Sequence, residues 1–181
     1  MFVRRVITGV DAQGRSVVVA DERIDGIRPS LVPGSEVHAI WGTDTVPVVP
    51  HDGAPPVVGT TYPQAGGVRF GLFNVLPDRS PRTQPDDLAG ALAEYEALRP
   101  GVLRYFEPGG TGMHTTPTVD VVIVLEGRVW MELDDGVEVA LGTGDVIVQN
   151  GARHAWRNHA DVPARLASVM VGATEAGATS S

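Results

Sequence analysis

The chain has 181 residues, which is long enough to bury a hydrophobic core without disulfide or metal support. Apolar residues make up 43% of it and no apolar run is long enough to cross a bilayer, which excludes compositional disorder and a membrane span. Its formal net charge of −8 opposes binding to a phosphate backbone, so we expect a small-molecule partner and neither nucleic acid nor membrane.

Cys and Lys are both missing from the sequence. Without Cys there are no thiolate nucleophiles, iron–sulfur clusters or Cys-ligated zinc sites. All 14 basic residues are Arg, and the lack of Lys excludes Schiff-base enzymes and Walker-type ATPases. No apolar stretch follows Arg4 and Arg5, so we expect no signal or transit peptide and a cytoplasmic location.

The N-terminal part of the chain is predicted to form strands. These strands cover residues 2–8, 16–20, 36–41 and 68–76, and the first two form a hairpin. Alternation in the third strand puts His38 and Ile40 on one face. Residues 42–67 are rich in Pro and Gly, show no sustained periodicity, and predict a long loop.

One helix is predicted, at residues 85–98. Acidic residues in its first turn suit the positive end of the helix dipole. Leu88, Leu92 and Tyr95 fall on one face and form an apolar stripe. This stripe predicts packing on a sheet or on a subunit partner, with a lid over a site as the alternative.

The remaining chain is dense in short strands separated by glycine turns. They are predicted at residues 102–107, 113–118, 120–126, 128–134, 137–141, 145–149, 152–157 and 164–171. This pattern is typical of an antiparallel barrel or jelly roll, so the predicted fold class is all-β. We therefore expect an N-terminal extension of strands, loop and helix at 1–101, a barrel at 102–171 and a flexible tail at 172–181.

Residues able to carry chemistry gather in the predicted barrel. His114, Thr116 and Asp120 stand at even spacing and share one face of an extended strand. His154 follows on a separate strand. An imidazole and a carboxylate from one strand and an imidazole from another are therefore expected to converge inside the barrel.

The segments Gly112–Gly127 and Gly144–Asn158 resemble the paired motifs of the cupin superfamily. In that family, a glycine-led first motif carries two histidines and a carboxylate, and the second runs through glycine, proline, glycine, histidine and asparagine. His114, Asp120 and His154 stand at matching positions. The resemblance implies a cupin double-stranded β-helix, extended here by N-terminal strands and one helix, and a homodimer formed through outer strands.

The sequence departs from the family's pattern at three points. Thr116 stands at the position of the second histidine, Asp120 replaces the usual glutamate, and the second motif lacks its proline. The resemblance therefore leaves His114, Asp120 and His154, a set of two histidines and one carboxylate, as ligands of a divalent metal. Fe(II) is the metal that such a set favours, with Zn, Mn or Ni as alternatives.

We expect an enzyme that acts on a carbonyl-bearing or aromatic metabolite, in oxidoreductase, isomerase or lyase chemistry within secondary metabolism. His114, Asp120 and His154 are the catalytic candidates. The candidates for substrate contact are Thr116, Arg104, Trp156 and Asn158.

Two alternatives stay open at this point. One is a metal-free isomerase, cyclase or dehydratase in which the histidines and Asp120 move a proton. The other is a cupin that binds a metabolite without converting it. The same cavity serves all three possibilities, so these residues alone do not separate them.

Overall fold

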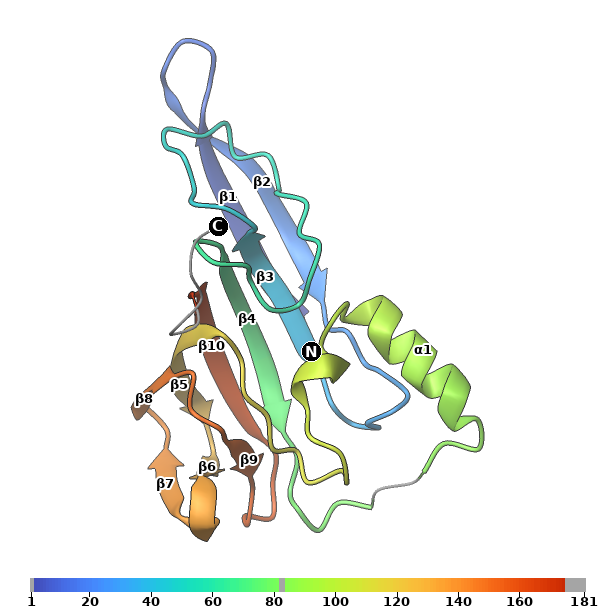
Figure 1. Cartoon of the computed structure of the whole chain (residues 1–181). Helices are drawn as coiled ribbons and strands as arrows, with labels where there is room; N and C mark the ends of the chain where they lie inside the picture. The colour runs from blue at the N-terminus through green and yellow to red at the C-terminus, as the bar shows by residue number, and fades with distance from the viewer. Residues whose placement is uncertain (1, 82–83, 175–181) are drawn as a thin grey trace.

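The computed structural model describes residues 2–81 and 84–174 (Figure 1). Its strands are β1 (Phe2–Val10), β2 (Ser16–Asp25), β3 (Val37–Thr43), β4 (Val68–Val75), β5 (Thr118–Glu126), β6 (Arg128–Glu132), β7 (Glu138–Gly142), β8 (Val146–Asn150), β9 (Ala155–Arg157) and β10 (Ala164–Gly172). They are joined by the helix α1 (Leu88–Leu98) and two 3₁₀ turns, Leu103–Tyr105 and Asp134–Gly136. The predicted all-β class with one helix is confirmed.

The strands form three antiparallel sheets. A five-stranded sheet has the order β3-β4-β10-β5-β8, and a three-stranded sheet has the order β7-β6-β9. The hairpin of β1 and β2 forms the third. Because β3 and β4 pair in the same sheet as β10 and β5, residues on both sides of position 101 share one layer (Figure 1).

A hydrophobic core lies between the five-stranded and three-stranded sheets. Val122 and Val124 of β5 and Leu166 of β10 meet Val129 of β6 and Leu141 of β7. These side chains alternate along their strands with outward-facing residues, as the period of two requires. Burial of this face is therefore what holds the two sheets together.

The turn between β5 and β6 depends on Gly127. Its φ angle is 84°, a conformation that side chains with a Cβ rarely adopt. A Cβ there would also lie 3.1 Å from the Cα of Ala164. The glycine that ends the first motif thus lets the start of β10 approach this turn closely.

The N-terminal hairpin covers part of the outer face of the five-stranded sheet. Val3 and Ile24 pack against Ile40, Leu72 and Ala167 on that face. The strand face predicted for Ile40 is therefore buried under the hairpin, whose turn projects beyond the end of the sheet (Figure 1).

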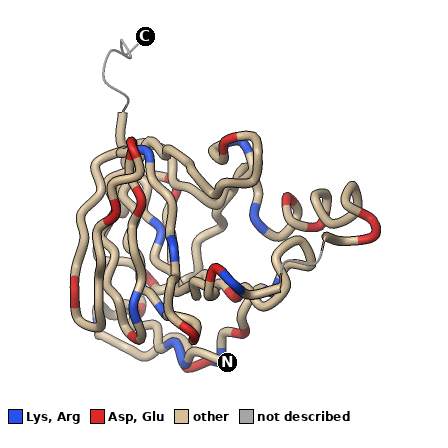
Figure 2. The backbone as a smooth tube through the Cα atoms, turned by 90° about the horizontal axis from the view of Figure 1, so that it is seen from below, with Lys and Arg blue, Asp and Glu red and all other residues tan. Residues whose placement is uncertain are grey.

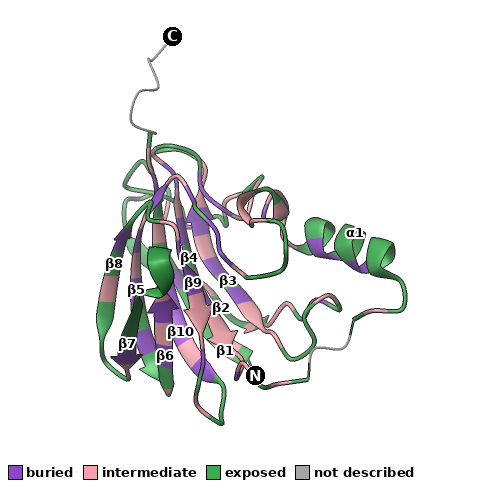
Figure 3. Cartoon of the chain, turned by 60° about the horizontal axis from the view of Figure 1, so that its bottom comes forward, coloured by how far each residue is buried: buried purple, intermediate pink, exposed green. Residues whose placement is uncertain are grey.

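The helix differs from its prediction in start and in buried face. It begins at Leu88, and Asp87 caps it by accepting a hydrogen bond from the backbone N–H of Gly90 at 2.9 Å. Ala91 and Tyr95 are buried, whereas Leu88 and Leu92 are exposed. The helix stands away from the sheets and touches the rest of the fold through a narrow face, which explains the difference (Figure 3).

Two predicted strands before β5 are wrong. Residues 102–107 form a 3₁₀ turn followed by an isolated bridge between Phe106 and His114. Residues 113–117 contain only the isolated bridges of His114, and β5 begins at Thr118. Pro117 has no N–H to give to a ladder, so regular pairing starts only after it.

The other strands follow their predictions with small shifts at the ends. The hairpin strands extend further than predicted, to Val10 and Asp25, and β9 is shorter, at Ala155–Arg157. Most of the predicted tail, residues 175–181, lies outside the described residues. Among the helices of the described chain, none is long and apolar enough to pass through a bilayer.

Acidic and basic positions are spread over the described chain and do not collect into one basic patch (Figure 2). Several pair across neighbouring strands, as Arg4 does with Asp21 and Arg5 with Glu22. Charges of both signs are therefore interspersed along this part of the chain.

We predict that Leu166→Ala lowers the free energy of unfolding by about 2 to 5 kcal/mol, because Leu166 is fully buried and its removal leaves a cavity. Urea unfolding followed by circular dichroism measures this. The matched control is Leu125→Ala, on β5 with 43% of its surface exposed, for which we expect a change of about 0.5 kcal/mol. Equal effects of the two variants would contradict the position of the core.

Candidate functional site

A cavity of about 870 Å³ lies against the inner face of the five-stranded sheet. Segments outside that sheet also line the cavity, among them the connection between β2 and β3, the loop before β4, the chain after β4, the C-terminal end of α1 with the 3₁₀ turn after it, and the chain leading to His114. Most of the lining is apolar, and a few polar groups converge on it. Such a combination is typical of a site for a small organic molecule.

His114 and His154 lie side by side in the cavity wall. The backbone N–H of each donates to the carbonyl of the other, at 2.9 and 3.0 Å. Their ring centroids are 4.2 Å apart with the planes tilted by 51°. Two segments remote in sequence are thus joined at the point where the imidazoles meet.

The backbone also fixes the ring nitrogen that carries the proton in each histidine. Nδ1 of His114 lies 3.0 Å from the carbonyl oxygen of Gly112, and Nδ1 of His154 lies 2.8 Å from that of Ala152. A carbonyl only accepts, so each Nδ1 is the donor and the neutral ring keeps its lone pair at Nε2. Both rings therefore offer a basic nitrogen.

Both imidazoles are neutral at pH 7. Burial is the main cause that lowers the pKa of His114 to about 4; repulsion from a protonated His154 and, less, from Arg99 adds to it, and the Gly112 carbonyl opposes it. Burial also lowers the pKa of His154. Phe106 stacks on His114 with ring centroids 4.7 Å apart, which adds to the exclusion of water.

Asp120 brings a carboxyl group to the same cavity. It lies on β5 opposite Gln149 of β8, and only 7% of its surface is exposed. Its Oδ1 has no hydrogen-bond partner among the described residues. Burial raises the pKa of this carboxyl, and a hydrogen bond from Thr118 opposes the rise in part. An unpartnered buried oxygen is costly and marks a polar contact point for a ligand.

The predicted metal set is not assembled. Nowhere in residues 2–81 and 84–174 do three or more His, Asp or Glu side chains lie close enough together to hold a metal ion. The two imidazoles stand together, but Asp120 does not join them as a third ligand. Two donors fall short of the three protein ligands that catalytic metal sites commonly supply, so we derive no step through a metal.

Of the four residues predicted to contact substrate, the structure places Trp156 in the cavity lining and the other three outside it. The hydroxyl of Thr116 pairs with that of Thr118 at 2.8 Å. Arg104 is exposed and donates to the hydroxyl of Tyr105 at 2.6 Å.

Asn158 is fully buried and joins two loops. Its amide nitrogen donates to the carbonyls of Val75 and Val162, both at 2.9 Å. Its side-chain oxygen accepts from the backbone of Ala160 at 3.0 Å. All the polar groups of this side chain are thus used in holding the chain ends of β4, β9 and β10 together.

Sequence reasoning missed Tyr62, Arg99 and Gln149 in the cavity lining. Gln149 lies directly across from Asp120 in the pairing of β5 with β8, but these strands are not consecutive, so no hairpin signal in the sequence predicts that pairing. Tyr62 lies in the long Pro- and Gly-rich loop, and Arg99 lies at the end of the helix. Neither residue belongs to a periodic pattern that would predict which way its side chain points.

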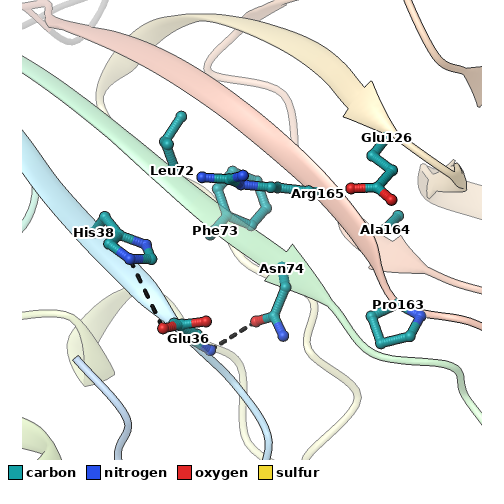
Figure 4. Close-up of a pocket in the computed structure, with 9 residues that line it drawn as sticks. All are labelled: Glu36, His38, Leu72, Phe73, Asn74, Glu126, Pro163, Ala164 and Arg165. Atoms are coloured by element: carbon teal, nitrogen blue, oxygen red, sulfur yellow. Dashed lines mark hydrogen bonds and ion pairs between the residues drawn. The ribbon is translucent and has the colours of Figure 1, made fainter. Parts of the chain in front are cut away.

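A second cavity, of about 170 Å³, lies at the end of the sheet where β4 ends and β10 begins (Figure 4). His38 and Glu36 form an ion pair there at 3.7 Å, and the side-chain oxygen of Asn74 accepts from the backbone N–H of Glu36 at 2.7 Å. Arg165 and Glu126 complete its charged groups. Both signs of charge are present in this small space, and the motif histidines His114 and His154 line the other cavity.

Comparison with known proteins agrees with the fold. The cupin domain model matches residues 102–171. "Phomopsin biosynthesis cluster protein D" of Diaporthe leptostromiformis is 32% identical over 156 residues, which cover 85% of this chain and 69% of that protein. The chain belongs to the cupin superfamily. The predicted family is therefore confirmed.

Other relatives of this cupin match shorter stretches. "Oryzines biosynthesis cluster protein J" of Aspergillus oryzae is 43% identical over 60 residues, which are 32% of this chain and 34% of that protein. Among solved structures, a putative ethanolamine utilization protein Q from Salmonella typhimurium aligns with a TM-score of 0.41 and 13% identity, over 96% of this chain and 99% of that one.

We predict that the stability of this cupin falls as the pH drops from 7 to 5. The unfolded chain binds a proton at His114 near pH 6.5, whereas the folded chain does so only near pH 4. Between these values protonation stabilises the unfolded state relative to the folded one, so the free energy of unfolding decreases. The expected loss from His114 is about 2 kcal/mol. Urea unfolding at both pH values measures it. His114→Asn should reduce the loss, and His51→Asn, at an exposed loop position, should leave it unchanged.

We also predict weak metal binding. After anaerobic incubation with Fe(II) or Zn(II) and desalting, elemental analysis should find far less than one metal ion per chain, because only two donors stand together. One ion per chain, lost in His154→Asn and retained in His159→Asn, would contradict this and restore the predicted metal set.

Proposed function

We propose that this cupin is an enzyme that binds a small, largely apolar carbonyl compound and moves a proton on it with the His114–His154 pair. One observation carries the proposal: two buried imidazoles, each with Nδ1 held by a backbone carbonyl, lie together in the wall of the 870 Å³ cavity. A neutral imidazole with a fixed lone pair is a general base.

The steps follow from the positions of these groups. Nε2 of one imidazole accepts a proton from the carbon next to the substrate carbonyl, and the electron pair of the broken C–H bond moves to the carbonyl oxygen. The same proton then returns to a different atom of the substrate, which amounts to isomerisation. Because the two rings are in contact, their protonation is coupled, and we assign the base to the pair.

Asp120 and the apolar wall support this reaction. Burial raises the pKa of the Asp120 carboxyl, and in its protonated form this group would donate a hydrogen bond to the oxygen that gains charge. Phe106 and Trp156 flank the imidazoles and exclude water from them. The chain thereby supplies base, oxygen contact and a dry cavity without a metal-dependent step.

The names of two relatives support a role in secondary metabolism. They are described as proteins of the phomopsin and oryzines biosynthesis clusters of fungi, and we place this chain likewise in the biosynthesis of a secondary metabolite. The homodimer expected from the family resemblance stays a prediction.

Hydrogen–deuterium exchange tests the proposal without knowledge of the natural substrate. Aryl ketones such as butyrophenone are incubated with the protein in D₂O, and NMR follows loss of the protons next to the carbonyl. We expect faster exchange with the wild-type protein, and loss of about a hundredfold or more in the variant His114→Asn/His154→Asn.

The matched control is His51→Asn, which removes an exposed imidazole that is not part of the cavity lining. It should exchange as fast as the wild-type protein. Exchange at the same rate in the double variant, with its fold intact by circular dichroism, would refute the proposal. Tight binding of the ketone with no exchange would support the non-catalytic alternative instead.

A further inference from the structure

The charged residues of the large cavity are mostly paired. Ion pairs join Arg5 to Glu22, Arg69 to Asp44, Glu107 to Arg153 and Asp78 to His159. Arg99 also lines the cavity, and no carboxylate of the described residues forms an ion pair with it. The cavity therefore contains a guanidinium with no ion-pair partner among the described residues; the Asp120 carboxyl in the same lining also forms no ion pair there, and burial raises its pKa, which favours its neutral form.

The fold holds Arg99 at the cavity wall. The residue ends α1, and its backbone N–H donates to the carbonyl of Tyr95 at 2.9 Å. Its Nη1 donates to the hydroxyl of Tyr95 at 3.1 Å, and Tyr95 itself is buried against Tyr62 and Val102. Within the described chain this is the one hydrogen bond of a side chain that has five donors, so the guanidinium keeps donors for a ligand.

Arg99 acts on the same space as the imidazoles. The charge of Arg99 contributes to the lowered pKa of His114 and opposes the rise in the pKa of Tyr62 that burial causes. Arg99 therefore lies within electrostatic reach of both side chains. The rest of the lining is largely apolar. A ligand with an apolar body and a single negative charge matches this wall in both respects.

We propose that the substrate of this cupin is an organic acid whose carboxylate binds to Arg99 while its carbonyl-bearing part lies against His114 and His154. This inference rests on the proposed function and names the substrate class for the same site. One cation without an ion-pair partner among the described residues calls for one anion, and a planar guanidinium pairs with a carboxylate through two parallel hydrogen bonds. Phosphate esters carry close to two negative charges and match this single cation less well.

Binding of such an acid would also change the pKa of His114. When a carboxylate neutralises Arg99, its contribution to the lowered pKa of His114 is cancelled, so that pKa rises in part, while the larger effects of burial and of His154 remain. The imidazole is thus a somewhat stronger base when a substrate of the right charge is in place. A neutral ligand of the same shape would leave His114 less basic.

A pair of probes tests the inference. 4-Oxo-4-phenylbutanoate carries an aryl ketone and a carboxylate, and its methyl ester is the neutral match. Fluorescence of Trp41 and Trp156, which line the cavity, reports binding of each. We expect the acid to bind the wild-type protein at least tenfold more tightly than the ester, since hydrogen bonds to charged groups are the stronger ones.

Variants assign that preference to Arg99. Arg99→Gln should bind the ester as the wild-type protein does and lose the preference for the acid, and Arg99→Lys should keep part of it. The matched control is Arg104→Gln, which removes an exposed guanidinium five positions along the chain and should keep the full preference. NMR titration adds a second measurement: the acid should raise the pKa of His114 in the wild-type protein and not in Arg99→Gln.

The outcomes separate the two proposals. If the ester binds and the acid binds no more tightly, or if Arg99→Gln keeps the preference, the inference about Arg99 is wrong while the cavity proposal stands. If neither probe binds the folded wild-type protein, the cavity does not take this class of ligand and both proposals fail.

Discussion

The reciprocal backbone bond between His114 and His154 is the interaction on which the site depends. It joins the segment before β5 to the segment before β9, one leading into the five-stranded sheet and the other into the three-stranded sheet. Each histidine also bonds through Nδ1 to the carbonyl two residues before it. The main chain therefore sets the distance between the rings and the direction of their lone pairs, and no further side chain is needed for that purpose.

The positive charge of Arg99 in the cavity wall contrasts with the negative net charge of the whole chain. The chain carries a formal net charge of −8, yet the cavity wall holds Arg99, which has no ion-pair partner among the described residues, beside neutral imidazoles. Arg99 is half-buried, so its charge is screened less than that of a fully exposed side chain. The pairing of the other charged lining residues, such as Arg69 with Asp44, makes this one position stand out.

The sequence was informative where a pattern repeats and uninformative where contacts are remote. Alternation located the strands, and the spaced motifs placed His114, His154 and Asp120 in one cavity. The strand predicted at 113–118 failed because Pro117 interrupts pairing. The structural role of Asn158 depends on carbonyls far away along the chain, which no local spacing reveals.

In the proposed function, chemistry and recognition are carried by different parts of the chain. The imidazoles belong to the barrel core, whereas Tyr62 and Arg99 come from the loop before β4 and the end of α1. Loops and helix ends tolerate substitution and insertion better than paired strands do. During evolution, such a protein can acquire new substrates through changes at these two places while its proton-transfer machinery stays intact, which suits a scaffold reused from one biosynthetic route to another.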